Sequence, residues 1–148
     1  MILAHTLIGL APLGKTEFFW YWFIGSVIAD IDHLYIIIKY QLFSWPKLID
    51  CLRFEKNYHV HFKTKYLHSI LGAIILTLPL LLISARGASY FFVAYLLHLL
   101  LDWPDIDEKQ YFYPYKLKIK GWLPIFSATE IIFTLVLIIS LIYIFIKL

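Results

Sequence analysis

The sequence has one cysteine and few charged residues, and these two scarcities exclude several classes of protein. Cys51 alone cannot form an internal disulfide, and no second cysteine is present for a Cys-x-x-Cys metal or redox motif. Charged residues make up 16% of the chain, against about 25% in soluble domains. The 13 lysines and arginines gather on no single helix face, so we expect no binding to nucleic acid despite the net charge of +3.

Hydrophobic residues take the place of the missing charge. They make up 61% of the 148 residues, against roughly 45–50% in an average soluble domain. A soluble domain of this length could not bury so much apolar surface, and a chain this apolar would not stay disordered. The composition therefore predicts a single integral-membrane domain over residues 1–148.

Four apolar stretches approach the length of about 20 residues that a helix needs to cross a membrane. They cover residues 18–38, 67–84, 88–103 and 131–146. Residues 123–126 could extend the last stretch upstream, and residues 2–13 are too short to cross, so we expect a re-entrant helix there. The expected fold class is all-α: a multi-pass transmembrane helical bundle with four spanning helices plus a short N-terminal re-entrant helix.

The basic residues are divided unevenly between the two sides of this bundle. The short connection at residues 85–87 requires a tight hairpin, which puts the polar segments 39–66 and 104–121 on the same side. These two segments hold ten of the thirteen lysines and arginines. The positive-inside rule makes that side cytoplasmic, so the sequence predicts a plasma (inner) membrane protein with its polar face toward the cytoplasm.

Histidine and aspartate interrupt the apolar stretches, where each charged group costs about 2.5–3.5 kcal/mol to insert. The residues concerned are Asp30, Asp32, His33, His68, His98 and Asp102. The topology brings them to one membrane depth, at the cytoplasmic ends of three helices. Asp30 and His33 share a helix face at i,i+3 spacing, as do His98 and Asp102 at i,i+4. His5 joins them if the N-terminus is also cytoplasmic.

Imidazole and carboxylate are the usual ligands of zinc and related divalent metals. We therefore expect a metal site whose ligands come from His5, Asp30, His33, His68, His98 and Asp102. Asp32 is the expected catalytic residue, either orienting a ligand histidine or acting as a general base. The ion is expected to be zinc, with manganese or iron as alternatives, in one or two copies.

Two other interpretations remain open. Chains of aspartate and histidine also serve proton-coupled and metal-ion transporters. The last apolar stretch, 131–146, has no acidic residue, which favours a site on one side of the membrane over a pathway through it. A network that only holds the helices together is the third interpretation.

The order of these motifs resembles that of the YdjM-like family of LexA-regulated, membrane-bound metal-dependent hydrolases. The shared pattern is an early histidine, Asp-x-Asp-His, His-Ser and His-x-x-x-Asp, in that order within residues 1–115. It is formed here by His5, Asp30–His33, His68-Ser69 and His98–Asp102. The resemblance implies a membrane-bound hydrolase with a divalent metal at the cytoplasmic face.

The middle motif departs from the family's usual His-Arg-Gly-x-Thr-His-Ser, since residues 61–69 read His-Phe-Lys-Thr-Lys-Tyr-Leu-His-Ser. We therefore expect Lys63 or Lys65 to supply the charge that binds an anionic substrate. The His/Asp arrangement is also distantly similar to zinc-dependent phospholipase C, which suggests a phosphoester or lipid headgroup as substrate and membrane lipids as partners. The roles of His59 and His61 and the oligomeric state stay open.

Overall fold

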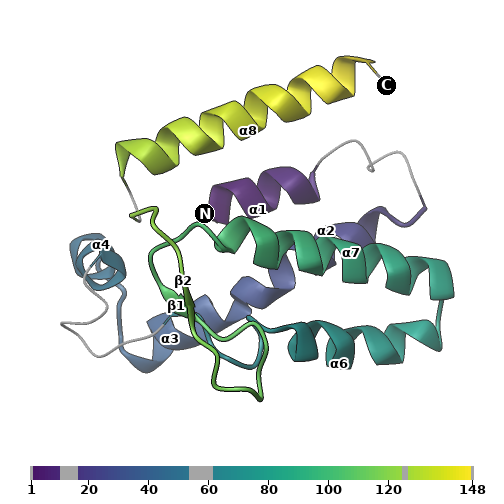
Figure 1. The fold of residues 1–148 in the computed structure, drawn as a ribbon, viewed down its shortest axis with the longest axis horizontal. Helices are drawn as coiled ribbons and strands as arrows, with labels where there is room; N and C mark the ends of the chain where they lie inside the picture. The colour runs from purple at the N-terminus through teal and green to yellow at the C-terminus, as the bar shows by residue number, and fades with distance from the viewer. Residues whose placement is uncertain (1, 11–16, 54–61, 125–126, 148) are drawn as a thin grey trace.

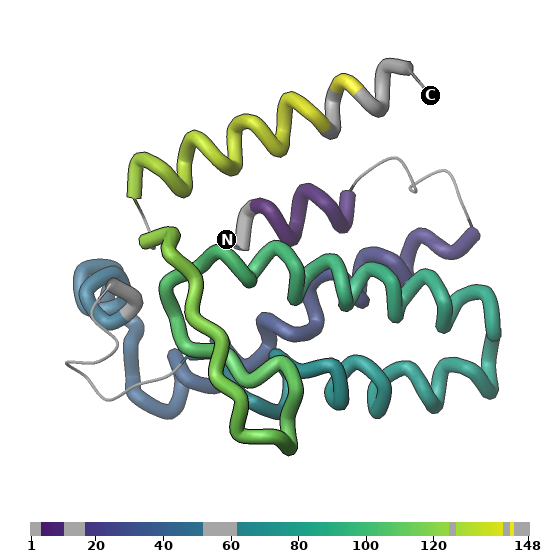
Figure 2. The backbone as a smooth tube through the Cα atoms, viewed as in Figure 1, coloured from purple at the N-terminus to yellow at the C-terminus, as the bar shows by residue number. Residues whose placement is uncertain are grey.

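The computed structural model describes residues 2–10, 17–53, 62–124 and 127–147, and the fold is mostly helical, as the sequence predicts (Figures 1 and 2). The described elements are α1 (Ile2–Gly9), α2 (Phe19–Val27), a 3-10 helix (Ile28–Asp30), α3 (Ile31–Lys39), α4 (Trp45–Arg53), α6 (Ile70–Leu81), α7 (Ala85–Asp102), β1 (Glu108–Lys109), β2 (Ile119–Lys120) and α8 (Ala128–Lys147).

One segment among the described residues has the length and composition of a membrane span. It is the continuous helical run Phe19–Lys39, which joins α2, the 3-10 helix and α3. The apolar helix α6 has 12 residues and rises about 18 Å, less than the roughly 30 Å of a hydrocarbon core. Among the described residues, one helix is thus both long and apolar enough to cross a membrane, where the sequence predicted four.

Helices α6 and α7 form the predicted tight hairpin, but both begin at other residues than expected. Ser69 Oγ accepts a hydrogen bond from the Gly72 amide at 3.1 Å, so α6 begins at Ile70 and not at residue 67. Ser84 caps α7 in the same way, so that helix begins three residues earlier than predicted. Because α6 begins only after Ser69, His68 lies just outside the helix, in the turn that leads into it.

The two polar segments contain elements that the sequence did not predict. The first holds α4, and the second folds into an antiparallel pair in which Glu108 faces Lys120. Leu123 pairs with Asp105 in an isolated β-bridge, so the predicted upstream extension of the last helix is wrong at Leu123. Helix α8 begins at Ala128, after Ser127 accepts a hydrogen bond from the Glu130 amide at 3.1 Å.

The closest helix packing joins α2 to α7, which lie side by side (Figures 1 and 2). Gly25 makes this possible, because a Cβ at that position would collide with the backbone carbonyl of Phe91. The approach also places the carbonyl oxygen of Ser26 at 2.8 Å from His98 Nδ1. The packing of these two helices therefore fixes one of the predicted site residues.

Replacing Gly25 by alanine should lower the free energy of unfolding by about 1–3 kcal/mol, because the added methyl group forces α2 away from α7. Thermal unfolding of the detergent-purified protein measures the change. The matched control is Ser89→Ala on the exposed face of α7, which should stay within about 0.5 kcal/mol of the original. Equal unfolding temperatures for the two variants would contradict the proposed backbone contact.

Candidate metal centre

Six of the predicted site residues come together near the start of α6 and the end of α7: His5, Asp30, His33, His68, His98 and Asp102. They come from α1, the 3-10 helix, α3, the turn before α6 and the end of α7. They form three overlapping triads, and within each triad the candidate ligand atoms lie within 4.8 Å of one another. The structure thus assembles the predicted ligand set, while coordination by these residues stays a prediction.

The triad of His68, His98 and Asp102 is the most deeply buried of the three. His68 Nε2 lies 3.5 Å from His98 Nε2 and 3.2 Å from Asp102 Oδ2, and His98 Nε2 lies 3.6 Å from the same oxygen. A tetrahedral zinc ion with bonds of about 2.0–2.1 Å separates its ligand atoms by about 3.3 Å. The three atoms therefore have the spacing of zinc ligands.

The outer nitrogens of both histidines are held by acceptors. His98 Nδ1 donates to the Ser26 carbonyl at 2.8 Å, and His68 Nδ1 donates to Asp32 Oδ2 at 2.9 Å. In the neutral tautomers that these bonds select, each Nε2 carries a lone pair. Those lone pairs face each other within the triad, an arrangement that a shared cation or proton stabilises. Holding Nδ1 in this way is how proteins orient metal-binding histidines.

Asp32 lies just outside the triad and connects two histidines. Besides His68, it accepts hydrogen bonds from His33 Nδ1 at 2.8 Å and from the Thr64 amide at 2.7 Å. Only 2% of its surface is exposed. Because both oxygens are already engaged, the geometry favours orientation of the histidines, the first of the two predicted roles, over general-base catalysis.

Two members of the cluster bury polar atoms without a hydrogen bond among the described residues. The atoms concerned are Oδ1 and Oδ2 of Asp102 and Nε2 of His5. His5 Nε2 lies 3.3 Å from Asp102 Oδ1, while its Nδ1 is 3.0 Å from Asp30 Oδ2. Leaving such a group unsatisfied costs about 1–3 kcal/mol, and more when it is charged. A divalent cation would satisfy these atoms, so the donor set fits a metal.

Lys63, one of the two lysines predicted to bind substrate, is buried beside the triad. Its Nζ lies 2.6 Å from Asp105 Oδ2, 3.0 Å from Asp102 Oδ1 and 3.8 Å from Asp107 Oδ2. Burial alone would lower the pKa of Lys63, but these carboxylates outweigh burial and raise the pKa above its usual value. Sequence reasoning missed the roles of Asp105 and Asp107, although their position directly after His-x-x-x-Asp was a usable signal.

Lys65, the other predicted substrate-binding lysine, is exposed and lines a cleft of about 280 Å³. Its Nζ lies 5.3 Å and 5.4 Å from the ring centroids of Tyr66 and Tyr113. Gln110 and Lys118 line the cleft from the opposite loop. Both predicted lysines thus line this cleft, but Lys63 is paired with buried carboxylates whereas Lys65 faces solvent.

Comparison with known proteins agrees with the resemblance in the motifs. The family model described as YdjM inner membrane protein matches residues 1–148 and so covers the whole ligand set. No curated protein and no solved structure matches the chain. His59 and His61, whose roles the sequence left open, lie outside the described residues.

Loss of a central ligand should abolish metal binding, and loss of an orienting group should weaken it. After loading with zinc, His98→Ala should retain no ion, whereas Asp32→Asn should bind with about 10–100-fold lower affinity. Elemental mass spectrometry and competition with a chelating dye measure the two effects. The exposed Asp50→Asn on α4 is the control and should match the original protein. Stoichiometric zinc in a folded His98→Ala protein would contradict the assigned site.

The buried ammonium of Lys63 should contribute far more to stability than an exposed lysine of the same chain. In metal-free protein, Lys63→Met should lower the free energy of unfolding by about 3–5 kcal/mol, because it leaves buried carboxylates without a countercharge. The control is Lys118→Met, which breaks an exposed pair with Glu108 at 2.8 Å and should cost under about 1 kcal/mol.

The pH dependence of that difference follows from the raised pKa of Lys63. The contribution of Lys63 is complete below the unfolded-state value of about 10.4 and is lost only as the pH rises through the folded-state pKa. The free energies of unfolding of the original protein and of Lys63→Met should therefore differ by the same amount at pH 7 and at pH 9. A gap that closes by pH 9 would show that Lys63 is not held by these carboxylates.

Proposed function

The chain belongs to the YdjM inner membrane protein family, and we propose that it is a membrane-bound metal-dependent hydrolase acting on a phosphoester, as in a lipid headgroup. The observation that carries the proposal is the buried triad of His68, His98 and Asp102, with its zinc-like spacing and its outward nitrogens held by acceptors. Zinc is the first candidate ion because imidazole and carboxylate ligands at this spacing suit it, with manganese and iron as alternatives.

The proposal also includes a membrane topology. Four segments cross the membrane, namely Phe19–Lys39, α6, α7 and α8, and α1 is re-entrant beside them. The short α6 is accommodated by local thinning of the bilayer. The metal centre then faces the cytoplasm, because the connections on its side carry most of the basic residues. These include the segment with Lys63 and Lys65 and the loop from Pro104 to Gly121.

A divalent metal at this centre supplies Lewis-acid activation of water and of the phosphoryl oxygens. His5, Asp30 and His33 complete the candidate ligand set, in triads that also include His98 or His68. In the reaction, water adds to phosphorus and the P–O ester bond breaks, which releases an alcohol and a phosphate product. Asp32 acts as a positioning residue that fixes His68 and His33. Lys63 neutralises Asp102 and keeps it in place while substrate binds.

The headgroup of the substrate binds in the cleft beside Lys65, with its phosphate reaching the metal centre. Lys63, Lys65 and Lys118 line this cleft together with Gln110 and with Glu108, whose carboxylate pairs with Lys118 at 2.8 Å. Thr64 lies in the same wall, and its backbone amide bonds to Asp32. The cleft is therefore joined to the metal centre through this hydrogen bond and through Lys63, which also lines the cleft and lies 3.0 Å from Asp102 Oδ1. An ammonium group attracts phosphate as a point charge without demanding one geometry, which suits headgroups of different shape.

The arrangement of titratable groups supports a hydrolase over a transporter. A transport pathway needs polar or ionisable groups at successive depths of the membrane. Helix α6 contains no ionisable residue, and Glu130 in the first turn of α8 is the only acidic residue of that helix. The six clustered side chains instead gather in one place, in triads whose ligand atoms lie within 4.8 Å of one another.

Metal-dependent turnover tests the proposal directly. Zinc-loaded protein should hydrolyse phospholipid in vesicles of phosphatidylglycerol and phosphatidylcholine, and His98→Ala should lose at least about a hundredfold in rate. Lys65→Gln should raise KM by roughly tenfold with little change in kcat, because it removes ground-state binding. Lys116→Gln, an exposed lysine of the opposite loop outside the cleft lining, is the charge-matched control. Absence of phosphoester turnover by fully metal-loaded protein would contradict the hydrolase assignment.

A further inference from the structure

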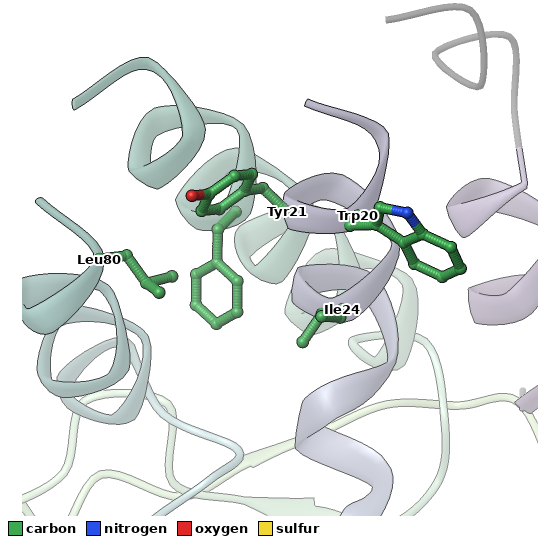
Figure 3. Close-up of a pocket in the computed structure, with 5 residues that line it drawn as sticks. Trp20, Tyr21, Ile24 and Leu80 are labelled. Carbon is green, nitrogen blue, oxygen red and sulfur yellow. The ribbon is translucent and has the colours of Figure 1, made fainter. Parts of the chain in front are cut away.

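A second, apolar cavity lies among the helices that carry the metal centre. Its volume is about 320 Å³, and it is lined by Trp20, Tyr21 and Ile24 of α2, Leu80 of α6 and Phe91 of α7 (Figure 3). No charged side chain lines it among the described residues. Its volume is at the lower end of the range of about 300–1,000 Å³ that is typical of ligand sites. It therefore suits a slender apolar group rather than a whole ligand.

The cavity opens at the surface of the helices and closes toward the core. Phe91 forms its floor with only 4% of its surface exposed, whereas Trp20 is 65% and Ile24 is 44% exposed on the rim. In the topology proposed above, this rim of exposed apolar side chains faces the bilayer, with Trp20 in the first turn of its span, where tryptophan suits the membrane interface. A group that enters the cavity therefore arrives from the lipid.

The position of the cavity relative to the metal centre follows from the helices they share. On α2 and its continuation, Ile24 precedes Asp30 by six residues, which is about 9 Å of helix rise. On α7, Phe91 precedes His98 by seven residues, or about 10 Å. Two neighbouring helices thus give the same offset in the same direction.

The third helix extends this series to the basic cleft. Lys65 lines the cleft, His68 belongs to the metal triad, and Leu80 lines the apolar cavity one α-helix further along the chain. The three sites therefore follow in the order of a phospholipid: the headgroup at the cleft, the phosphoester at the metal centre and a hydrocarbon chain in the apolar cavity. Neither an entirely soluble phosphoester nor a free phosphate would use the third site.

We propose that this cavity binds one acyl chain of a lipid whose phosphate group lies at the metal centre. The inference rests on the proposed function and narrows its substrate class to membrane-resident amphiphiles that carry an anionic headgroup. For a lipid taken up from water, each methylene group that the cavity buries strengthens binding about fourfold, so affinity depends on chain length.

Filling the cavity tests this inference without relying on turnover. Delipidated protein in detergent is titrated with phosphatidylglycerols carrying chains of six, eight, ten and twelve carbons, and bound lipid and zinc are counted by native mass spectrometry. Affinity should rise with chain length in the original protein. Leu80→Trp should weaken binding of the longest chain at least tenfold and flatten the length dependence. Leu78→Trp, on an exposed position of the same helix outside the cavity, is the control and should bind as the original does.

The outcomes separate the failure of this inference from the failure of the hydrolase proposal. Equal lipid binding by Leu80→Trp and Leu78→Trp with zinc retained overturns the acyl-chain site and leaves the metal centre standing. Absence of zinc in the original protein overturns the hydrolase proposal, whatever the lipid result. A change from dimer to monomer in Leu80→Trp with lipid binding unchanged would assign the cavity to a second copy of the chain and overturn the inference. If Leu80→Trp does not fold, Ile24→Trp with Ile31→Trp as its control gives the same comparison.

Discussion

Carboxylates buried in an apolar helix bundle need partners, and this need organises the protein. Asp32 and Asp102 are almost completely buried, and 15% of the Asp30 side chain is exposed. Asp32 is satisfied by two histidines and a backbone amide. Asp102 has Lys63 at 3.0 Å but no hydrogen bond to either oxygen among the described residues. The cation that we propose, held by Asp102 and its neighbouring histidines, would complete this arrangement.

The backbone is shaped locally to bring these groups to one point. The 3-10 helix Ile28–Asp30 interrupts the run from α2 to α3 at the motif that carries Asp30 and Asp32. Ser69 caps α6, so His68 lies in the turn before the helix. There the hydrogen bond to Asp32 orients its imidazole ring. Gly25 lets α2 touch α7, which brings a backbone acceptor to His98. Each of these three local features positions a side chain of the same cluster.

Sequence reasoning reached the cluster but not all of its surroundings. The convergence of His68 and His98 was predictable because hydrophobic periodicity and connection length fix which helix ends share a side. The ion pairs of Lys63 were not, because they depend on how the loop after α7 folds back through the pairing of residues 108–109 with 119–120. The helix starts were missed for a smaller reason: Ser-x-x-Gly caps at Ser69 and Ser84 are local signals that hydropathy does not register.

The central claim is that two imidazoles and a carboxylate hold one cation, and zinc K-edge X-ray absorption of the loaded protein measures this directly. The structure predicts a nitrogen and oxygen shell at about 2.0–2.1 Å with imidazole scattering, and fewer imidazoles after His98→Ala. A spectrum without imidazole, or with a sulfur ligand at about 2.3 Å from Cys51, would contradict the assigned centre.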